Sequence, residues 1–157
     1  CGICGVEALE QALPELTQLN WQRPPSNEAL TNLREKVVEA QRAARQSGAL
    51  HAALYVDAQG QVRLCREDIG RHNAMDKLIG AMNLAKVKPK EGFVVITSRC
   101  SLELIQKAVR AGLSTLVTLA SPTALAVQWA RRYRLNLIHA PQSSGARLYS
   151  GERLCID

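Results

Sequence analysis

The apolar residues of this chain form short groups with helical or extended spacing, separated by polar and glycine-rich turns. From Ser26 to Gly48 they recur every three or four residues, and this period predicts an amphipathic helix. Serine is favoured at the start of a helix and glycine just after its end, so Ser26 and Gly48 agree with the helix that the period predicts. The positions predicted to face inward are Leu30, Leu33, Val37, Ala40 and Ala44.

Two extended segments and a second helix are predicted next. Residues 50–56 and 62–65 flank the turn Asp57-Ala58-Gln59-Gly60, and this arrangement predicts a β-hairpin. After a polar stretch, apolar positions at helical spacing predict a helix from about Arg71 to Asn83.

The second half of the chain alternates strands with helices. Residues 93–97 are a continuous apolar run, typical of a strand buried on both faces, and a helix is predicted from Ser101 to Gly112. Strands at 115–119 and 135–139, a helix at 121–133 between them and a short edge strand at 147–149 complete the pattern. Strands that alternate with helices pair in parallel through right-handed crossovers. We therefore expect an α/β protein, a three-layer α/β/α sandwich with a hairpin at its start.

Composition narrows the class of protein. With 157 residues, 46% of them apolar and 22% charged, the chain suits one globular domain, and no run of about 20 apolar residues is available to cross a membrane. The net charge of +6 favours anionic partners, but the basic residues are scattered, so we expect no DNA binding. We expect residues 1–25 to be a flexible segment and linker, and residues 26–157 to form the α/β/α domain.

The five cysteines, an odd number, argue against a disulfide-stapled secreted domain and favour the cytoplasm. Cys1 and Cys4 form a Cys-x-x-Cys pair among glycines. Such a pair can share a metal ion, cycle between dithiol and disulfide, or present one nucleophilic thiolate beside a second thiol. A structural zinc ion needs four ligands and the other candidates are dispersed, so we expect no metal site. For Cys65, Cys100 and Cys155 we expect buried, small apolar side chains.

Polar residues are dense in four segments where helices begin or strands end. Arg71-His72 begins a predicted helix, whose unpaired N–H groups and dipole suit a phosphate. The segments 97–101, 121–123 and 140–145 each follow a predicted strand. Because ligands of open α/β sheets gather beyond the carboxyl ends of the strands, we expect these three loops to line one pocket. Ordinary helix caps and hydrated helix starts are the alternative.

Five motifs stand in order along nearly the whole chain. They are Cys1-Gly2-Ile3-Cys4-Gly5, Gly48-Ala49-Leu50-His51-Ala52-Ala53, Glu67-Asp68-Ile69-Gly70-Arg71-His72-Asn73-Ala74-Met75-Asp76-Lys77, Arg99-Cys100-Ser101-Leu102-Glu103 and Ser121-Pro122-Thr123-Ala124-Leu125-Ala126. This order resembles the formate dehydrogenase accessory sulfurtransferase family, FdhD. The resemblance implies a cytidine-deaminase-like fold for the α/β/α domain and a further N-terminal domain before the chain's first residue.

The resemblance also implies a sulfur carrier, or sulfurtransferase, of molybdenum cofactor biosynthesis. Such proteins accept sulfane sulfur from a cysteine desulfurase and pass it to the bis-molybdopterin guanine dinucleotide cofactor of formate dehydrogenase. In this role they act as a chaperone of the enzyme. The resemblance assigns the persulfide to Cys1 and an auxiliary thiol to Cys4. Sulfur transfer needs a reachable thiolate, and a glycine-flanked segment suits that need. Multiple turnovers and one sulfur per cofactor stay open as alternatives.

Guanine nucleotide binding is a further implication, with GDP or GMP as mimics of the cofactor. The loop that matches the family's nucleotide loop consists of Ala140, Pro141, Gln142, Ser143, Ser144 and Gly145. Pyrophosphates demand basic side chains and helix N-termini, so the further contacts we expect are Arg71, His72, Arg99 and Ser101. The chain departs from the family's Gly-Phe-x-Arg pattern at residues 139–142. We expect a homodimer, because the cofactor has two pterin halves. The alternative function is a zinc- or nucleotide-binding scaffold that transfers no sulfur.

Overall fold

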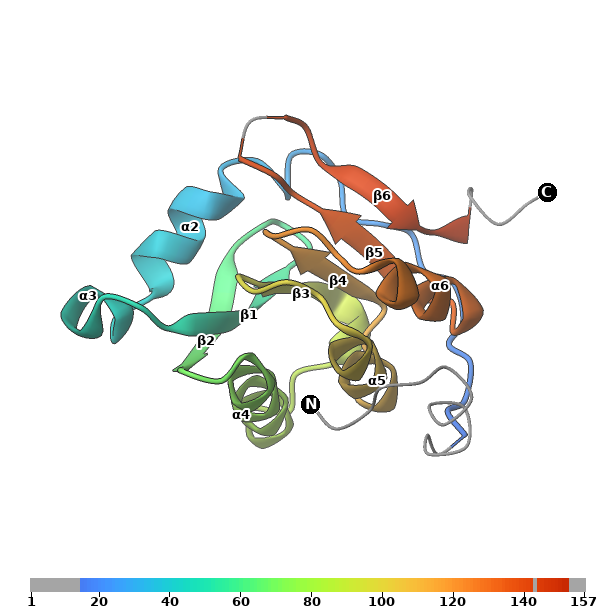
Figure 1. The fold of residues 1–157 in the computed structure, drawn as a ribbon, viewed down its shortest axis with the longest axis horizontal. Coiled ribbons are helices and arrows are strands. Elements are labelled where there is room, and N and C mark those ends of the chain that lie inside the picture. The colour runs from blue at the N-terminus through green and yellow to red at the C-terminus, as the bar shows by residue number, and fades with distance from the viewer. Residues whose placement is uncertain (1–14, 143, 153–157) are drawn as a thin grey trace.

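The computed structural model describes residues 15–142 and 144–152. Within them, a mixed sheet of six strands is the middle layer of the fold (Figure 1). The strands are β1 (His51–Asp57), β2 (Val62–Asp68), β3 (Gly92–Ile96), β4 (Thr115–Thr118), β5 (Asn136–His139) and β6 (Arg147–Ser150). Their order across the sheet is β2-β1-β3-β4-β5-β6. The predictions made for Cys1, Cys4, Ser143 and Cys155 concern residues outside the described ones.

The direction of the strands brings several polar loops to one end of the sheet. β3, β4 and β5 are parallel, as predicted. β1 is antiparallel to both β2 and β3, so β2 points in the same direction as β3, and β6 is antiparallel to β5. The ends of β2 to β5 and the starts of β1 and β6 therefore meet. We call this end the carboxyl edge (residues 51, 67–72, 97–103, 118–123, 139–142 and 144–147).

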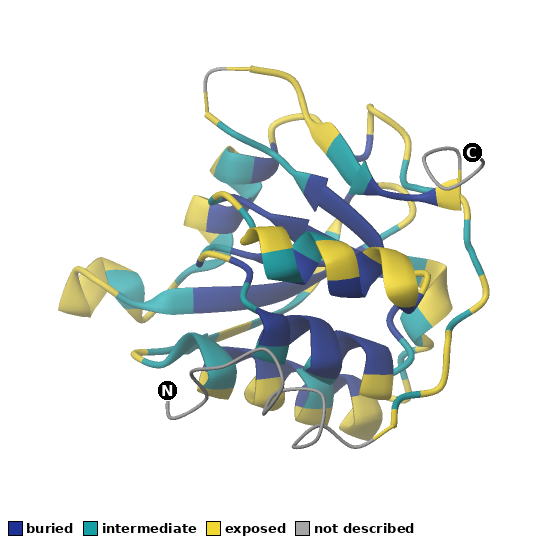
Figure 2. Ribbon diagram, turned by 45° about the vertical axis from the view of Figure 1, so that its right-hand side comes forward, coloured by how far each residue is buried: buried dark blue, intermediate teal, exposed yellow. Residues whose placement is uncertain are grey.

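Helices cover both faces of the sheet (Figure 1). α4 (Arg71–Leu84), α5 (Leu102–Arg110) and α6 (Ala124–Arg132) lie on one face, and α2 (Leu33–Ala40) lies on the other. The short α3 (Ala44–Ser47) precedes β1, and the 3-10 helix η1 (Pro89–Glu91) precedes β3. Figure 2 shows α4 and α5 with buried sides toward the sheet and exposed sides toward solvent. These layers confirm the predicted α/β/α sandwich.

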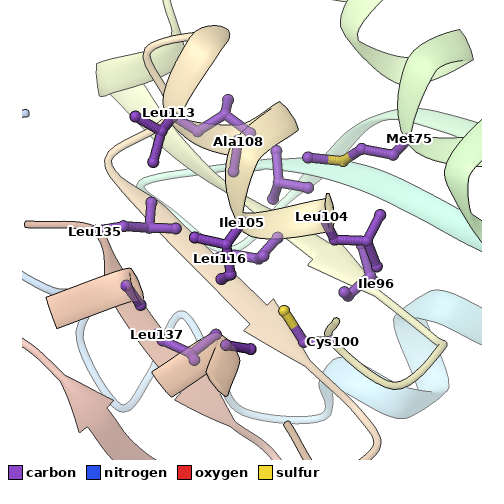
Figure 3. Packing of buried hydrophobic residues seen from close by; sticks show 14 of the residues in the cluster. Met75, Ile96, Cys100, Leu104, Ile105, Ala108, Leu113, Leu116, Leu135 and Leu137 are labelled. Carbon is purple, nitrogen blue, oxygen red and sulfur yellow. The ribbon is translucent and has the colours of Figure 1, made fainter. Parts of the chain in front are cut away.

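Two hydrophobic clusters fill the spaces on either side of the sheet. The larger one packs α4, α5 and α6 onto the sheet (Figure 3), and its fully buried side chains include Met75, Leu104, Ile105, Leu116 and Leu137. The smaller one packs Leu33 and Val37 of α2 onto the other face. Residues 93–96 of β3 alternate between the two clusters, as the two-residue period of a strand requires. β3 is thus buried on both faces, as predicted. Each such side chain contributes about 1.5–3 kcal/mol on burial.

The single helix predicted for residues 26–48 is wrong. Asn32 adopts a left-handed backbone conformation with φ of 52°, so turns precede α2 instead of a continuous helix. Beyond α2, the carboxylate of Glu67 on β2 accepts hydrogen bonds from the backbone N–H groups of Ala43, at 2.7 Å, and Ala44, at 3.1 Å. These bonds satisfy backbone N–H groups at the start of α3, which would otherwise lack a partner, so α3 begins as a helix separate from α2. A contact between segments distant in sequence therefore replaces the continuous helix that the local pattern predicted.

Residues 15–25 lie along α6 and β5. The backbone N–H of Leu19 donates to the carbonyl oxygen of Tyr133 at 3.0 Å. The side chain of Gln18 donates to the carbonyl oxygen of Arg132 at 2.8 Å, and Asn136 Nδ2 donates to the carbonyl oxygen of Gln22 at 2.8 Å. These bonds attach the described end of the predicted linker to the sandwich.

Candidate functional site

The carboxyl edge gathers the described residues that the sequence predicts to bind a ligand. They are Arg71, His72, Arg99, Ser101, Ala140, Pro141, Gln142, Ser144 and Gly145. Three histidines also lie there, His51 at the start of β1, His72 at the start of α4 and His139 at the end of β5. Parallel strands place their carboxyl ends side by side, which explains why segments far apart in sequence meet.

Asp68, the last residue of β2, holds the start of α4 in place. Its carboxylate accepts hydrogen bonds from Lys77 Nζ at 2.5 Å and from the backbone N–H of Gly70 at 2.8 Å. These two bonds are the main causes that lower the pKa of Asp68 to about 2. The carboxylate is therefore ionised at neutral pH, and it fixes the turn from which Arg71 and His72 extend.

The starts of α4 and α5 are electrostatic neighbours. Burial is the first cause that lowers the pKa of His72, and the adjacent Arg71 is the second, so both favour the neutral form of His72. Burial alone would raise the pKa of Glu103, but the neighbouring polar groups of its own backbone and of Ser101 bring the pKa below its usual value. His72 and Arg71 add to that lowering, which shows that they lie near Glu103. A cationic Arg71 thus faces an ionised Glu103 across this part of the edge.

Thr118, which the sequence analysis missed, connects two loops at the middle of the edge. Its side chain is 0% exposed, and Oγ1 lies 2.9 Å from the carbonyl oxygen of Ser98 and 2.7 Å from that of Ala120. The backbone N–H of Thr123 also donates to the carbonyl oxygen of Cys100 at 3.1 Å. The loop after β3 and the loop after β4 are therefore joined by side-chain and backbone bonds. A polar residue at the end of an apolar strand was the available sequence signal.

Arg34, which the sequence analysis also missed, reaches the edge from α2. Its Nη2 donates to the carbonyl oxygen of Leu119 at 2.6 Å and to that of Ala140 at 3.2 Å. One guanidinium thus ties together the chain after β4 and the chain after β5. Nothing in the helical pattern distinguished this arginine from the other basic residues of its segment.

Two cysteines are described, and neither suits a nucleophilic role. Cys100 is 0% exposed, and burial raises the pKa of its thiol to about 12. Cys65 is partly buried, and burial first and Glu67 second raise its pKa to about 11. The predicted burial is confirmed for Cys100. Cys65 is only partly buried, packed against the smaller hydrophobic cluster, because β2 is an edge strand of the sheet.

Two cavities of the described structure lie away from the predicted ligand residues. A cavity of about 980 Å³ is lined by residues 22–27, Gly92, Ser114 and Leu148, near the opposite end of the sheet. A second cavity, of about 620 Å³, lies between α2 and β2. Neither cavity is lined by Arg71, Arg99 or the loop 140–145. The residues predicted to bind the nucleotide therefore line neither of these two cavities, although Ala146 and Glu67, at the margins of the carboxyl edge, line one cavity each.

Two further features concern metals and membranes. Within residues 15–142 and 144–152, no three side chains of His, Cys, Asp or Glu are grouped as ligands of a metal ion. Among the described helices, none has both the length and the apolar character needed to span a bilayer.

Comparisons with known proteins agree with the sequence motifs. The chain is 42% identical over 150 residues to the "Sulfur carrier protein FdhD" of Xanthomonas oryzae pv. oryzae (strain MAFF 311018), an alignment that covers 96% of this chain and 53% of the relative. It is 37% identical over 150 residues to the protein of that name from Bordetella petrii, covering 96% of this chain and 54% of the relative. The chain spans about half the length of these curated relatives.

A solved structure supports the fold. The crystal structure of a protein described as a formate dehydrogenase accessory protein, from Desulfotalea psychrophila, superposes with a TM-score of 0.77 at 21% sequence identity. The match covers 95% of this chain and 62% of that one. In sequence, the profile of the FdhD/NarQ family matches residues 1–155. Since that match includes nearly every residue, the chain belongs to the FdhD/NarQ family.

Proposed function

We propose that this chain carries sulfane sulfur on Cys1 and delivers it to bis-molybdopterin guanine dinucleotide, the molybdenum cofactor of a formate dehydrogenase. The observation that carries the proposal is the 42% identity, over 96% of the chain, to a protein named sulfur carrier protein FdhD. The proposed donor is a cysteine desulfurase. The proposed carrier is a homodimer in the reducing cytoplasm, where thiols persist.

The state of the described thiols supports the choice of the Cys-x-x-Cys pair. A thiol must be ionised and reachable to attack a persulfide. Cys100 and Cys65, with pKa values of about 12 and about 11, stay protonated at neutral pH, and Cys100 is fully buried. This supports a role for the Cys1–Cys4 pair in accepting sulfur, and the family resemblance assigns the persulfide to Cys1 and the second thiol to Cys4.

The proposed sulfur relay has two steps. The Cys1 thiolate attacks the terminal sulfur of the donor's persulfide, so a Cys1 persulfide forms and the donor cysteine leaves as a thiolate. The Cys4 thiolate then attacks the inner sulfur of Cys1. A Cys1–Cys4 disulfide forms, and the terminal sulfur leaves as sulfide for the metal centre of the cofactor. The two electrons that convert the terminal sulfur to sulfide come from Cys1 and Cys4, and a cellular dithiol then reduces the Cys1–Cys4 disulfide back to two thiols.

The proposed binding site of the cofactor's guanine nucleotide is the carboxyl edge. Arg71 begins α4 and the exposed Arg99 precedes α5, so two guanidinium groups flank helix N-termini, an arrangement that suits pyrophosphate. Ser101 precedes α5 directly, and the loop 140–145 supplies further polar groups two strands away. GDP is the probe for this part of the proposal.

Intact-mass spectrometry tests the sulfur step. After incubation of the chain with a cysteine desulfurase and cysteine, we expect a gain of about 32 Da, the mass of one sulfur atom. Cys1→Ala should abolish the gain, whereas Cys4→Ala and the matched control Cys100→Ala should keep it. Native spectra with GDP report nucleotide occupancy and oligomeric state in the same experiment. A Cys1→Ala chain that still gains the mass refutes the assignment.

A further inference from the structure

The fold collects much of the chain's positive charge at the end of the sheet opposite the carboxyl edge. There α4, α5 and α6, which lie on one face of the sheet, end and lead into β3, β4 and β5 (Figure 1). We call this end the amino edge (residues 84–92, 110–115 and 131–136). It carries seven basic residues and one acidic residue, Glu91. This surplus equals the net charge of +6 of the whole chain, whereas the carboxyl edge has three basic and three acidic residues.

Six of the basic side chains at the amino edge are exposed residues with little compensation, and we call them the amino-edge cations. They are Lys86, Lys88, Lys90, Arg110, Arg131 and Arg134. In the ion pairs between described residues, only Lys88 of the six has a carboxylate partner, Glu91, at 3.1 Å. Both side chains of that pair are well exposed, so it neutralises little charge. The three lysines follow the last turn of α4 instead of lying within it, so the dipole of the helix does not account for them.

An exposed leucine lies next to these cations. Leu84, the last residue of α4, is 88% exposed, which makes it the most exposed large apolar side chain among the described residues. Protein–protein contacts typically combine an apolar centre with a polar rim. Leu84 beside the three lysines offers that combination to a partner.

Nucleic acids match the amino edge less well than an acidic protein does. Phosphate groups favour the N-termini of helices, whereas the amino edge presents the carbonyl ends of three helices. Single-stranded nucleic acids stack their bases on exposed aromatic rings. Trp129 and Tyr133 are only 8% and 7% exposed, and the guanidinium of Arg132 lies over both rings, at 5.4 and 5.8 Å from their centroids. Carboxylates distributed over a folded partner are therefore the matching chemistry.

The segment that carries the Cys1–Cys4 pair joins the described fold at the amino edge. The side chain of Gln18 donates to the carbonyl oxygen of Arg132, and the backbone N–H of Leu19 donates to that of Tyr133. The pair is thus connected to the fold through this edge, while the nucleotide is proposed to bind at the opposite one. A protein that docks at the amino edge leaves the carboxyl edge accessible to the cofactor.

We propose that the amino edge is the docking surface for the protein that donates sulfur to Cys1, and that the donor contacts it with an acidic face. This inference rests on the proposed function, since it specifies where the donor of the same relay binds. The amino-edge cations attract the acidic face and speed association, an effect that salt screens. Leu84 adds an apolar contact, which salt does not weaken.

Two triple variants of the purified full chain, each lacking three positive charges, test the docking surface. The test variant carries Lys86→Gln, Lys88→Gln and Lys90→Gln. The matched control carries Arg42→Gln, Arg45→Gln and Arg66→Gln, at exposed positions near the start of β1 and the end of β2. All six positions are exposed, so both variants should fold, and thermal unfolding checks this.

Biolayer interferometry measures the binding of each chain to a purified cysteine desulfurase. At low salt the lysine variant should bind about tenfold more weakly than the control, and the difference should shrink at high salt. The control should bind like the unchanged chain. Leu84→Ala should weaken binding at both salt concentrations. Equal binding by the lysine variant and the control overturns the docking surface.

A second sulfur donor separates docking from the sulfur step. Cysteine persulfide is a small molecule that needs no docking surface, and intact-mass spectrometry follows the loading of Cys1 from either donor. The lysine variant should load slowly from the desulfurase but at the unchanged rate from cysteine persulfide. Lysine-dependent binding of the desulfurase without loading from either donor supports the surface and refutes the sulfur carrier. A chain that binds an RNA oligonucleotide or anionic phospholipid vesicles but not the desulfurase overturns the proposal.

Discussion

Replacement of Thr118 by valine isolates one hydroxyl that joins two loops of the carboxyl edge. The side chain is 0% exposed, and its Oγ1 lies 2.9 Å from the carbonyl oxygen of Ser98 and 2.7 Å from that of Ala120. Valine has nearly the same shape but donates no hydrogen bond. The single hydroxyl proton serves one carbonyl at a time, so the substitution removes one bond and leaves an acceptor without this donor.

The expected loss of stability follows from these contacts. A net hydrogen bond contributes about 1 kcal/mol, and an unsatisfied buried acceptor costs about 1–3 kcal/mol. Burial of the added methyl group recovers about 0.8 kcal/mol. We therefore expect Thr118→Val to lower the free energy of unfolding by about 1–3 kcal/mol. With a denaturant slope of about 2 kcal/mol per molar urea, the midpoint should fall by about 0.5–1.5 M.

Urea unfolding followed by circular dichroism measures the difference, and Thr31→Val is the matched control. Thr31 is exposed, although its Oγ1 donates to the carbonyl oxygen of Asn27 at 2.9 Å, so water can replace the lost bond. We expect the control to lose less than about 0.5 kcal/mol. A Thr118→Val chain as stable as the unchanged one, or a control that loses as much, refutes the reasoning that burial makes this hydroxyl important.

Three further predictions concern packing, thiols and acid. Gly92→Ala should cost more than about 3 kcal/mol, because an added Cβ would overlap a backbone oxygen of β1. Gly80→Ala, which meets no atom within 4 Å, should stabilise α4 by up to about 1 kcal/mol in the same urea assay, and equal effects would contradict the packing argument. Cys100 and Cys65, with pKa values of about 12 and about 11, should resist iodoacetamide at pH 8 in the folded chain and react after unfolding. Peptide mass spectrometry measures the labelling of both cysteines, and rapid labelling of Cys100 in the folded chain would contradict its burial. Asp68 has a folded pKa of about 2, below its ordinary value of 3.8, so its stabilising effect is present above pH 3.8 and is lost as the pH falls toward 2. Unfolding measured from pH 5 to pH 2 should show less acid dependence in Asp68→Asn, and an unchanged profile would exclude this carboxylate as a cause.

Local signals in the sequence were sufficient for most of the α/β pattern. The turn at 57–60 and the apolar run at 93–97 predicted the hairpin and the doubly buried β3, and both are present. Here the side chains' own period decides which face they present, and neighbouring strands only reinforce it. The same signals placed Arg71, Arg99 and the loop 140–145 next to helix starts and strand ends. Parallel strands then bring these segments to one edge.

The sequence by itself therefore determined the layers, the parallel strands and the list of polar loops, because each depends on a repeating local preference. Only the tertiary structure decided where the helix after Ser26 breaks, since Glu67 on a distant strand caps α3. It also decided that Arg34 joins the ends of two strands and that Thr118 joins two loops. Apart from the bond between Thr118 and Ala120, these bonds connect residues 20 to 106 positions apart. Their partners are backbone N–H and carbonyl groups that nearly every residue carries, so the local sequence does not single them out and only the assembled sheet brings them together.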